Sequence, residues 1–403
     1  MNSEPTEGGP DFRGRVRAVV HGVAFGDAMG APVEKLSAAE IRNRYGRVTS
    51  LRTVWHRDGQ DAAQRNGRVR GHGIVTDDTA MTLALMRIYD RERRHLDAWD
   101  MAEGMVREIV WHRGWVPELQ REAALIERLF YPEKWIYQRH QLSGCDPRQG
   151  GIGNMVNCGA AMYIAPVGVA NACDPRAAYD EAVAFASGHQ QSYGLEAAGV
   201  LAAAVAQAFV PGVDLAAIVR TAHDLAHDGT RAAIAAIAEA AETLIQSGSG
   251  PDEVTETFHR TIAPFSPMGD DVTHRLEKAG VPTHAYQPSR LFSIEELPLA
   301  LGFCLTAGGD FRQAVVDGIN SGRDTDSIGV MAGAILGALH GPKVIDPEDA
   351  ELLDQANRLD LSAAAARFAD TAQAMLAADG ANARDIAKRR AALGACISEE
   401  VAR

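Results

Sequence analysis

The sequence has few lysines, few aromatic residues and few cysteines, and these shortages exclude several classes of protein. Lysine occurs five times in 403 residues, and acidic residues outnumber lysine and arginine by 53 to 40. The net charge of −13 argues against nucleic acid as a partner, because binding to phosphates requires a basic surface. The five cysteines contain no Cys-x-x-Cys pair, so we expect reduced thiols and no zinc site.

Long hydrophobic runs are missing as well. No uncharged apolar stretch approaches the roughly 20 residues that a membrane-spanning helix requires. The first ten residues are polar and acidic and lack the apolar core of a signal peptide. We therefore expect a soluble, cytoplasmic protein without a membrane partner, present as a monomer or a small homo-oligomer.

The pattern that dominates the chain is the spacing of apolar residues in helices. Strand-like alternation is weak and confined to residues 48–54. We predict an all-α fold with a disordered tail at residues 1–11 and a single helical domain at 12–400. The predicted helices cover residues 12–29, 79–89, 98–112, 117–130, 157–164, 175–186, 194–209, 214–227, 230–246, 251–262, 294–307, 311–319, 327–339, 347–358, 362–377 and 381–398.

Two segments of the first third stand apart from this pattern. All five tryptophans lie between residues 55 and 135, so we expect an aromatic-rich insertion or subdomain at about 99–150. Its aromatic side chains could pack together or form a wall for a planar base. The polar, glycine-rich residues 56–73 predict a loop, which could be a lid over a site or only a connection.

A first acidic cluster, Thr76-Asp77-Asp78-Thr79, directly precedes an apolar helix. One interpretation is helix capping, because a threonine cap and acidic residues in the first turn both stabilise a helix N-terminus. The other interpretation is a metal site, because carboxylate and hydroxyl oxygens are the ligands that magnesium prefers.

A second acidic cluster follows about 250 residues later. Asp324 and Asp326 alternate with hydroxyl residues behind Gly322, without the glycine and glutamate spacing of an EF-hand loop. The apolar helix that follows contains Gly333 and Gly337, which we expect to serve close helix packing because glycine disfavours helices by about 1 kcal/mol. If the two clusters meet, four carboxylates converge, and cations between them are expected. The pair of clusters therefore predicts a binuclear metal hydrolase.

Four sequence blocks resemble the ADP-ribosylglycohydrolase family, which includes the dinitrogenase reductase-activating glycohydrolases. The blocks are Gly22–Glu34, Thr76–Thr79, Asn157–Pro166 and Ser321–Gly329, and the similarity extends over about residues 14–341. The resemblance implies a compact orthogonal helical bundle with a central pair of Mg²⁺ ions, with Mn²⁺ as an alternative metal.

The resemblance also implies roles for individual residues. Glu34, Asp77 and Asp326 are the expected catalytic residues; the other interpretation of Glu34 is an ordinary surface carboxylate beside Lys35, and the match of the whole preceding block favours the catalytic one. Serine stands at position 327, where the family usually has threonine, and it keeps the hydroxyl ligand. The expected metal ligands are Thr76, Asp77, Asp78, Asp324, Asp326 and Ser327.

The segment that resembles the family's substrate loop departs from the usual Gly-Asn-Gly-Ala-Ala-Met-Arg. It keeps an asparagine but has Cys158 in place of a glycine and Tyr163 in place of the arginine. His189 could bind substrate or be a packed polar residue, and Asp27 could bind substrate or cap a helix. The expected substrate-binding residues are Asp27, Asn157, Gly159, Tyr163 and His189.

The activity that the resemblance implies is hydrolysis of a glycosidic bond at a ribose. The expected substrate is an ADP-ribosylated protein or a small ribosylated molecule, with an N- or O-linked acceptor. A hydrolase of nucleoside-like ribosides is the alternative suggested by Cys158 and Tyr163. A relative without activity, which binds ADP-ribose or acts structurally, is a second alternative.

Overall fold

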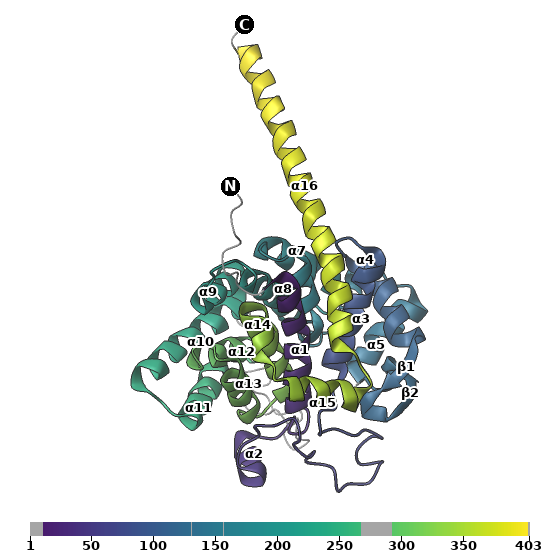
Figure 1. The fold of residues 1–403 in the computed structure, drawn as a ribbon, viewed down its shortest axis with the longest axis vertical. Coiled ribbons are helices and arrows are strands. Elements are labelled where there is room, and N and C mark those ends of the chain that lie inside the picture. Colours follow the sequence, from purple (N-terminus) through teal and green to yellow (C-terminus); the bar gives the residue numbers. More distant parts are fainter. Residues whose placement is uncertain (1–10, 130, 156, 267–291, 402–403) are drawn as a thin grey trace, which may run out of the picture.

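The computed structural model describes residues 11–129, 131–155, 157–266 and 292–401, and the described chain is mostly helical (Figure 1). The predicted tail at residues 1–11 lies outside the described residues except for Asp11, whose side chain caps the first helix. The helices are α1 (Phe12–Gly30), α2 (Ala38–Tyr45), α3 (Asp77–Glu92), α4 (Ala98–Asp100), α5 (Tyr131–Ser143), α6 (Ala165–Ala170), α7 (Pro175–Ala186), α8 (Ser192–Ala208), α9 (Leu215–Leu225), α10 (Asp228–Ser247), α11 (Pro251–Ile262), α12 (Glu296–Thr306), α13 (Phe311–Asn320), α14 (Thr325–His340), α15 (Pro347–Asn357) and α16 (Leu361–Val401).

Helices α1 and α14 form the centre of the bundle and run antiparallel in close contact. A Cβ atom at Gly22 would lie 2.3 Å from the carbonyl oxygen of Gly333, and one at Gly26 would lie 2.2 Å from that of Gly329. Glycines four residues apart lie on one face of a helix, so these glycines let the two backbones touch. The C-terminal end of α1 therefore reaches the N-terminal end of α14, where the second acidic cluster begins.

The same contact confirms the prediction that Gly333 and Gly337, which lie in α14, serve close helix packing. A Cβ atom at Gly333 would lie 2.2 Å from the carbonyl oxygen of Gly22, and one at Gly337 would lie 2.5 Å from that of Ala18. Around this pair, α3, α8, α12, α13 and α16 complete the core, and α1 itself is buried almost continuously from Val16 to Gly30.

The aromatic-rich region departs most from the predicted helices. The predicted helix at 117–130 is wrong, because a two-stranded antiparallel sheet is present there, with β1 (Arg113–Val116) paired to β2 (Arg121–Ala124). Pro117 opens a 3-10 turn that ends at Gln120 with a left-handed φ of 52°, which reverses the chain. The predicted helix at 98–112 is confirmed as a continuous helical segment over residues 98–111, although after α4 most of it is π-helical, in the turns Met101–Met105 and Arg107–Trp111.

Three other predictions need correction. The segment 157–164 is a loop ending in one 3-10 turn at Ala161–Tyr163 rather than a helix. The Asn157 side chain accepts a hydrogen bond from the Gly159 amide at 3.0 Å, a local bond that competes with helix formation. Helices α2, α5 and α6 were not predicted, and the two predicted C-terminal helices are one continuous helix, α16.

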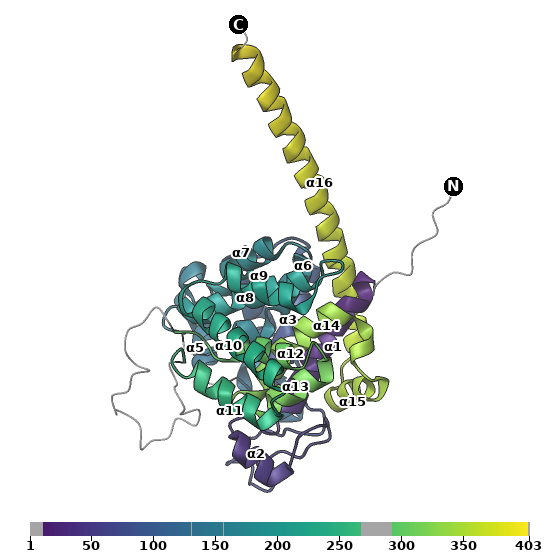
Figure 2. The ribbon, with the colours of Figure 1, turned by 90° about the vertical axis from the view of Figure 1, so that its left-hand side faces the viewer.

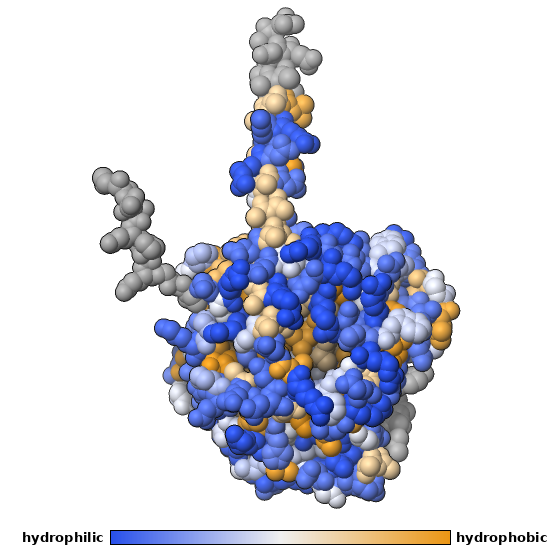
Figure 3. All heavy atoms as spheres, turned by 45° about the vertical axis from the view of Figure 1, so that its right-hand side comes forward, coloured by the Kyte–Doolittle hydropathy of each residue, from blue (hydrophilic) through white to orange (hydrophobic). Residues whose placement is uncertain are grey.

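The outer part of α16 extends away from the helical body (Figures 1 and 2). The face of the body shown in Figure 3 is largely hydrophilic, with scattered apolar patches. No helix of the described ranges is long and apolar enough to span a membrane.

Candidate metal centre and active site

The two acidic clusters meet at the N-termini of two helices. Thr76 is the N-cap of α3, and Asp77 and Asp78 are in its first turn. Asp324 is the N-cap of α14, and Ser327 in its first turn donates a hydrogen bond of 3.1 Å to Asp78 Oδ1. The capping and metal interpretations of the first cluster are therefore compatible, because a helix N-terminus also favours negative charge.

Backbone hydrogen bonds bring Glu34 to the same place. The Lys35 amide donates to the carbonyl of Arg323 at 3.0 Å, and the Arg323 amide donates to the carbonyl of Leu36 at 3.0 Å. These bonds attach the chain after α1 to the turn before Asp324. One carboxylate oxygen each of Glu34, Asp324 and Asp326 lies within 4.8 Å of the others.

A cavity of about 300 Å³ opens onto these carboxylates. It is lined by Glu34, Lys35, Arg68, Arg70, Asp77, Asp78, Arg128, Asn157, Cys158, Gly159, Met162, Asp324, Asp326 and Ser327. No tryptophan occurs in this lining among the described residues, and Trp115 lines a different cavity. Trp99, Trp111 and Trp135 are exposed by 48%, 64% and 52%.

Two buried arginines pair with the carboxylates, and the sequence analysis did not identify either. Arg70 forms ion pairs with Glu34 and with Glu118, the second at 2.6 Å, and Arg128 pairs with Asp77 and with Glu118. Glu118 is 1% exposed and joins the two arginines. Arg70 belongs to the glycine-rich loop at 56–73, so this loop supplies part of the cavity wall.

The remaining acidic residues are crowded and buried. Burial, together with the nearby Glu296 and Glu34, raises the pKa of Asp324 to about 8. Burial and neighbouring carboxylates also raise the pKa of Asp78 and of Asp326 well above the ordinary value. The two arginines therefore offset only part of the negative charge.

Glu34 behaves differently from these three aspartates. Burial alone would raise the pKa of Glu34, but the charges of Arg70 and Lys35 outweigh it and hold the pKa well below its ordinary value. Glu34 is therefore ionised at neutral pH.

The donor types of the lining suit hard divalent cations such as Mg²⁺ and Mn²⁺. Of the six expected metal ligands, Asp77, Asp78, Asp324, Asp326 and Ser327 line the cavity, whereas Thr76 is not in this lining. Positive charge between the clusters would also relieve the repulsion that raises the aspartate pKa values.

Two of the expected substrate-binding residues, Asn157 and Gly159, line the cavity. Gln190 holds their loop, because its side-chain oxygen accepts a hydrogen bond of 2.8 Å from the Ala160 amide and its side-chain nitrogen donates to the carbonyl of Asn157. No sequence motif indicates this role, and Gln190 is marked only by its position next to His189.

The other three expected substrate-binding residues, Asp27, Tyr163 and His189, are not in the cavity lining and are fully buried. Asp27 is fully buried and accepts hydrogen bonds from the Thr76 amide at 2.9 Å and from the Thr79 hydroxyl at 2.5 Å. Asp27 therefore anchors the start of α3, as its helix-capping interpretation predicted. Tyr163 donates to or accepts from His189 at 2.7 Å, and both side chains are fully buried.

The far nitrogen of His189 pairs with Glu133, which is also fully buried. His189 is therefore held inside the protein between Tyr163 and Glu133. A Cβ atom at Gly159 would lie 2.4 Å from Glu133 Oε1, so the group formed by Glu133, His189 and Tyr163 supports the substrate loop from behind.

A sequence model of the family described as ADP-ribosylglycohydrolase matches residues 9–379. The chain belongs to the ADP-ribosylglycohydrolase family. This membership confirms the resemblance carried by the four sequence blocks.

Relatives of this ADP-ribosylglycohydrolase family member occur in bacteria and archaea. It is 27% identical over 357 residues to the uncharacterized protein YegU of Escherichia coli (strain K12), covering 86% of this chain and 94% of the relative. It is 26% identical over 327 residues to an uncharacterized protein of Archaeoglobus fulgidus, covering 80% of this chain and 87% of the relative.

A solved structure, an ADP-ribosylglycohydrolase-related protein complex, superimposes with a TM-score of 0.54 at 19% sequence identity. The match covers 90% of this chain and 99% of that structure. It supports the mostly helical fold expected for this ADP-ribosylglycohydrolase family member.

Proposed function

We propose that this protein is a metal-dependent hydrolase that cleaves a ribosyl glycosidic bond, with an N- or O-linked ADP-ribosyl group as substrate. The single observation that carries this proposal is the meeting of Asp77, Asp78, Asp324 and Asp326 in one cavity. Family membership supplies the class of bond. A cytoplasmic location, where reduced thiols persist, is part of the same proposal.

Six residues would hold two Mg²⁺ or Mn²⁺ ions: Thr76, Asp77, Asp78, Asp324, Asp326 and Ser327. When bound, the ions would supply electrostatic orientation of the ribose hydroxyls and would acidify a water molecule. Arg128 forms an ion pair with Asp77, and both side chains line the cavity.

Glu34 is the proposed acceptor of the water proton. Its carboxylate lines the cavity and is held ionised by Arg70, so it is unprotonated and can accept a hydrogen bond from the attacking water throughout the neutral range. The anomeric carbon becomes positively charged in the transition state of glycoside hydrolysis. The surrounding carboxylates, Asp78 and Asp326 included, would stabilise that charge.

One arginine that lines the cavity, Arg68, favours a substrate that carries a diphosphate. Arg68 is half-buried and lines the cavity, and its side chain donates to the backbone carbonyl of Arg128. No ion pair of Arg68 with a carboxylate occurs within the described part of the chain, unlike Arg70 and Arg128. An arginine fork suits a phosphate, so Arg68 could supply the positive charge that Tyr163 does not.

The size of the cavity favours the riboside alternative. A volume of about 300 Å³ is at the lower end of ligand pockets, which span roughly 300–1,000 Å³. A free nucleoside is smaller than an ADP-ribosyl group and carries no diphosphate for Arg68 to bind.

The test is a direct comparison of ADP-ribosyl-arginine, ADP-ribosyl-serine and free nucleosides, each with Mg²⁺ or Mn²⁺. We expect release of ADP-ribose and a loss of kcat/KM of about tenfold or more in Arg68→Ala, the size of a charge-assisted hydrogen bond. Hydrolysis of nucleosides alone, unchanged in Arg68→Ala, would support the riboside alternative. Magnesium binding without turnover of any substrate would support a relative without activity.

A further inference from the structure

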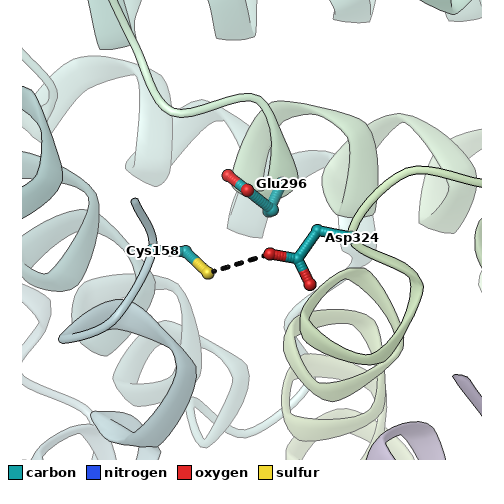
Figure 4. Close-up of side chains that lie close together, drawn as sticks. All are labelled: Cys158, Glu296 and Asp324. Atoms are coloured by element: carbon teal, nitrogen blue, oxygen red, sulfur yellow. Dashed lines mark hydrogen bonds between the residues drawn. The ribbon is translucent and has the colours of Figure 1, made fainter. Parts of the chain in front are cut away.

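Cys158, Glu296 and Asp324 converge beside the candidate metal centre from three separate elements of the fold. Cys158 belongs to the loop before α6, Glu296 begins α12, and Asp324 caps α14. One ligand atom of each residue lies within 4.8 Å of the other two. In Figure 4 the thiol and the Asp324 carboxylate face each other below Glu296.

The thiol points at oxygen atoms rather than into an apolar pocket. Cys158 Sγ lies 3.6 Å from Asp324 Oδ2 and 3.3 Å from Ser327 Oγ. Cys158 is 4% exposed and also lines the cavity, so a small ion could reach its sulfur from that side.

The side chain of Glu296 independently indicates that a bound ion would complete this group of residues. Its side chain is 8% exposed, yet Oε2 has no hydrogen-bond partner among the residues that the structure describes. Leaving a buried carboxylate oxygen unpaired is costly. The neighbouring Glu295, by contrast, accepts hydrogen bonds of 3.1 and 2.9 Å from Arg323.

We propose that Cys158, Glu296 and Asp324 form a second metal site, which binds one zinc ion through the cysteine sulfur and two carboxylates. Zinc in proteins is four-coordinate and accepts cysteine, histidine and carboxylate ligands, and three protein ligands leave a position for water. Magnesium does not favour sulfur, so the thiolate distinguishes this site from the proposed magnesium pair. On binding, the S–H bond breaks, a sulfur–zinc bond forms, and the proton passes to solvent.

The proposal rests on the proposed function in one respect, because Asp324 belongs to both ligand sets. A zinc ion here would share that carboxylate with the magnesium pair. Zinc binding itself requires no hydrolytic activity, so it can be measured independently.

The experiment uses cobalt(II) as a spectroscopic substitute for zinc on the full-length, metal-free protein in excess magnesium. Sulfur coordination gives cobalt a thiolate-to-metal charge-transfer band in the near ultraviolet. We expect this band at one cobalt per chain, and one equivalent of zinc should remove it. Cys158→Ser and Cys158→Ala should abolish the band, and Glu296→Gln should weaken cobalt binding at least about tenfold, the size of a lost ligand.

Cys173→Ser is the matched control, because Cys173 is exposed, its thiol donates to the carbonyl of Phe209 and it is not one of the three proposed ligands; this variant should keep the band. Circular dichroism on both Cys158 variants establishes that they are folded. Cobalt binding without the band, a band unchanged in a folded Cys158→Ser protein, or a band lost in Cys173→Ser would overturn the proposal.

Asp77→Asn separates the two proposals. It should impair magnesium binding but keep the cobalt band, because Asp77 is not a ligand of the zinc site. If the wild-type protein gives the band but binds no magnesium, the proposed function fails and the zinc site stands. If it binds magnesium but gives no band, the zinc site fails and the proposed function stands.

Discussion

The hydroxyl of Ser327 donates a hydrogen bond of 3.1 Å to Asp78 Oδ1 across 249 positions of the sequence. Each residue lies in the first turn of its helix, so the bond joins the N-termini of α3 and α14. Two helix dipoles therefore point their positive ends at the same group of carboxylates. These dipoles contribute to holding the carboxylates together, and the arginines next to them contribute more.

Replacing one of these carboxylates should make the metal-free protein more stable and at the same time less active. Asp326 is 4% exposed and lies among like charges, so Asp326→Asn should raise the free energy of unfolding of the metal-free protein by about 1 kcal/mol. The same change should lower kcat/KM at least about 10³-fold, or roughly 4 kcal/mol. Thermal unfolding in chelator and steady-state kinetics measure the two effects.

Asp224→Asn is the control for this change, because the Asp224 side chain is 75% exposed. It should alter neither quantity by more than about 0.5 kcal/mol. Turnover retained by Asp326→Asn without metal would contradict the metal-dependent mechanism. A large loss of stability in Asp326→Asn would show that the carboxylates do not repel one another in the folded, metal-free protein.

Magnesium should stabilise the folded protein, because the paired clusters exist only in the folded state. At a concentration 100 times its dissociation constant, one bound ion contributes about 2.7 kcal/mol. Calorimetry and unfolding in the presence of MgCl₂ or chelator measure this gain. In Asp78→Asn the gain should be mostly lost, and an equal gain in that variant would place magnesium elsewhere.

The sequence predicted the two helix N-termini of the site but not their neighbours. The acidic clusters stand next to long apolar helices, and glycines at a spacing of four indicate close packing, so these features are local. Arg70, Arg128 and Glu118 carry no such signal. They lie in a loop and in a turn, and only the folded chain brings their charges to Glu34 and Asp77.

The aromatic-rich region was the least predictable part of the fold. Its apolar residues suit a helix or a strand equally, and tertiary packing decides between them. In the substrate loop, the side-chain bond of Asn157 to the Gly159 amide competes with the helix that the alanines favour. His189 and Tyr163 were found from the resemblance, but their burial depends on Glu133, which lies more than 50 residues from His189 in sequence.

Replacing a glycine at the contact of α1 and α14 should destabilise the protein, although alanine normally favours a helix. A Cβ atom at Gly26 would lie 2.2 Å from the carbonyl of Gly329, so Gly26→Ala must push the two helices apart. We expect a loss of about 2–3 kcal/mol and a lower kcat, because α14 carries Asp326. Denaturant unfolding and kinetics measure both effects.

Gly380→Ala provides the matched control in α16. The nearest atom to a Cβ there is Arg384 Nη1 at 3.4 Å, the end of a flexible side chain. This variant should be more stable by up to about 1 kcal/mol. If Gly26→Ala also made the protein more stable, this result would contradict the close contact between α1 and α14.

A histidine far from the cavity should make stability depend on pH. His95 Nδ1 lies 2.6 Å from Glu181 Oε2, and Nε2 lies 3.1 Å from Asp379. The hydrogen bond to Glu181 is the largest cause that raises the pKa of His95 from 6.5 to about 9. The folded protein therefore binds this proton more tightly than the unfolded chain does.

The direction in which the free energy of unfolding changes with pH follows from this difference in proton binding. The stabilisation is fully present below pH 6.5 and is lost as the pH rises through about 9. Because the side chain is 40% exposed, solvent screening reduces the contribution to about 1 kcal/mol. Urea unfolding of the wild-type protein and of His95→Gln across this pH range measures it: the two curves should differ at low pH and converge above pH 9. A constant difference across the range would show that His95 stabilises the fold by packing rather than by its charge.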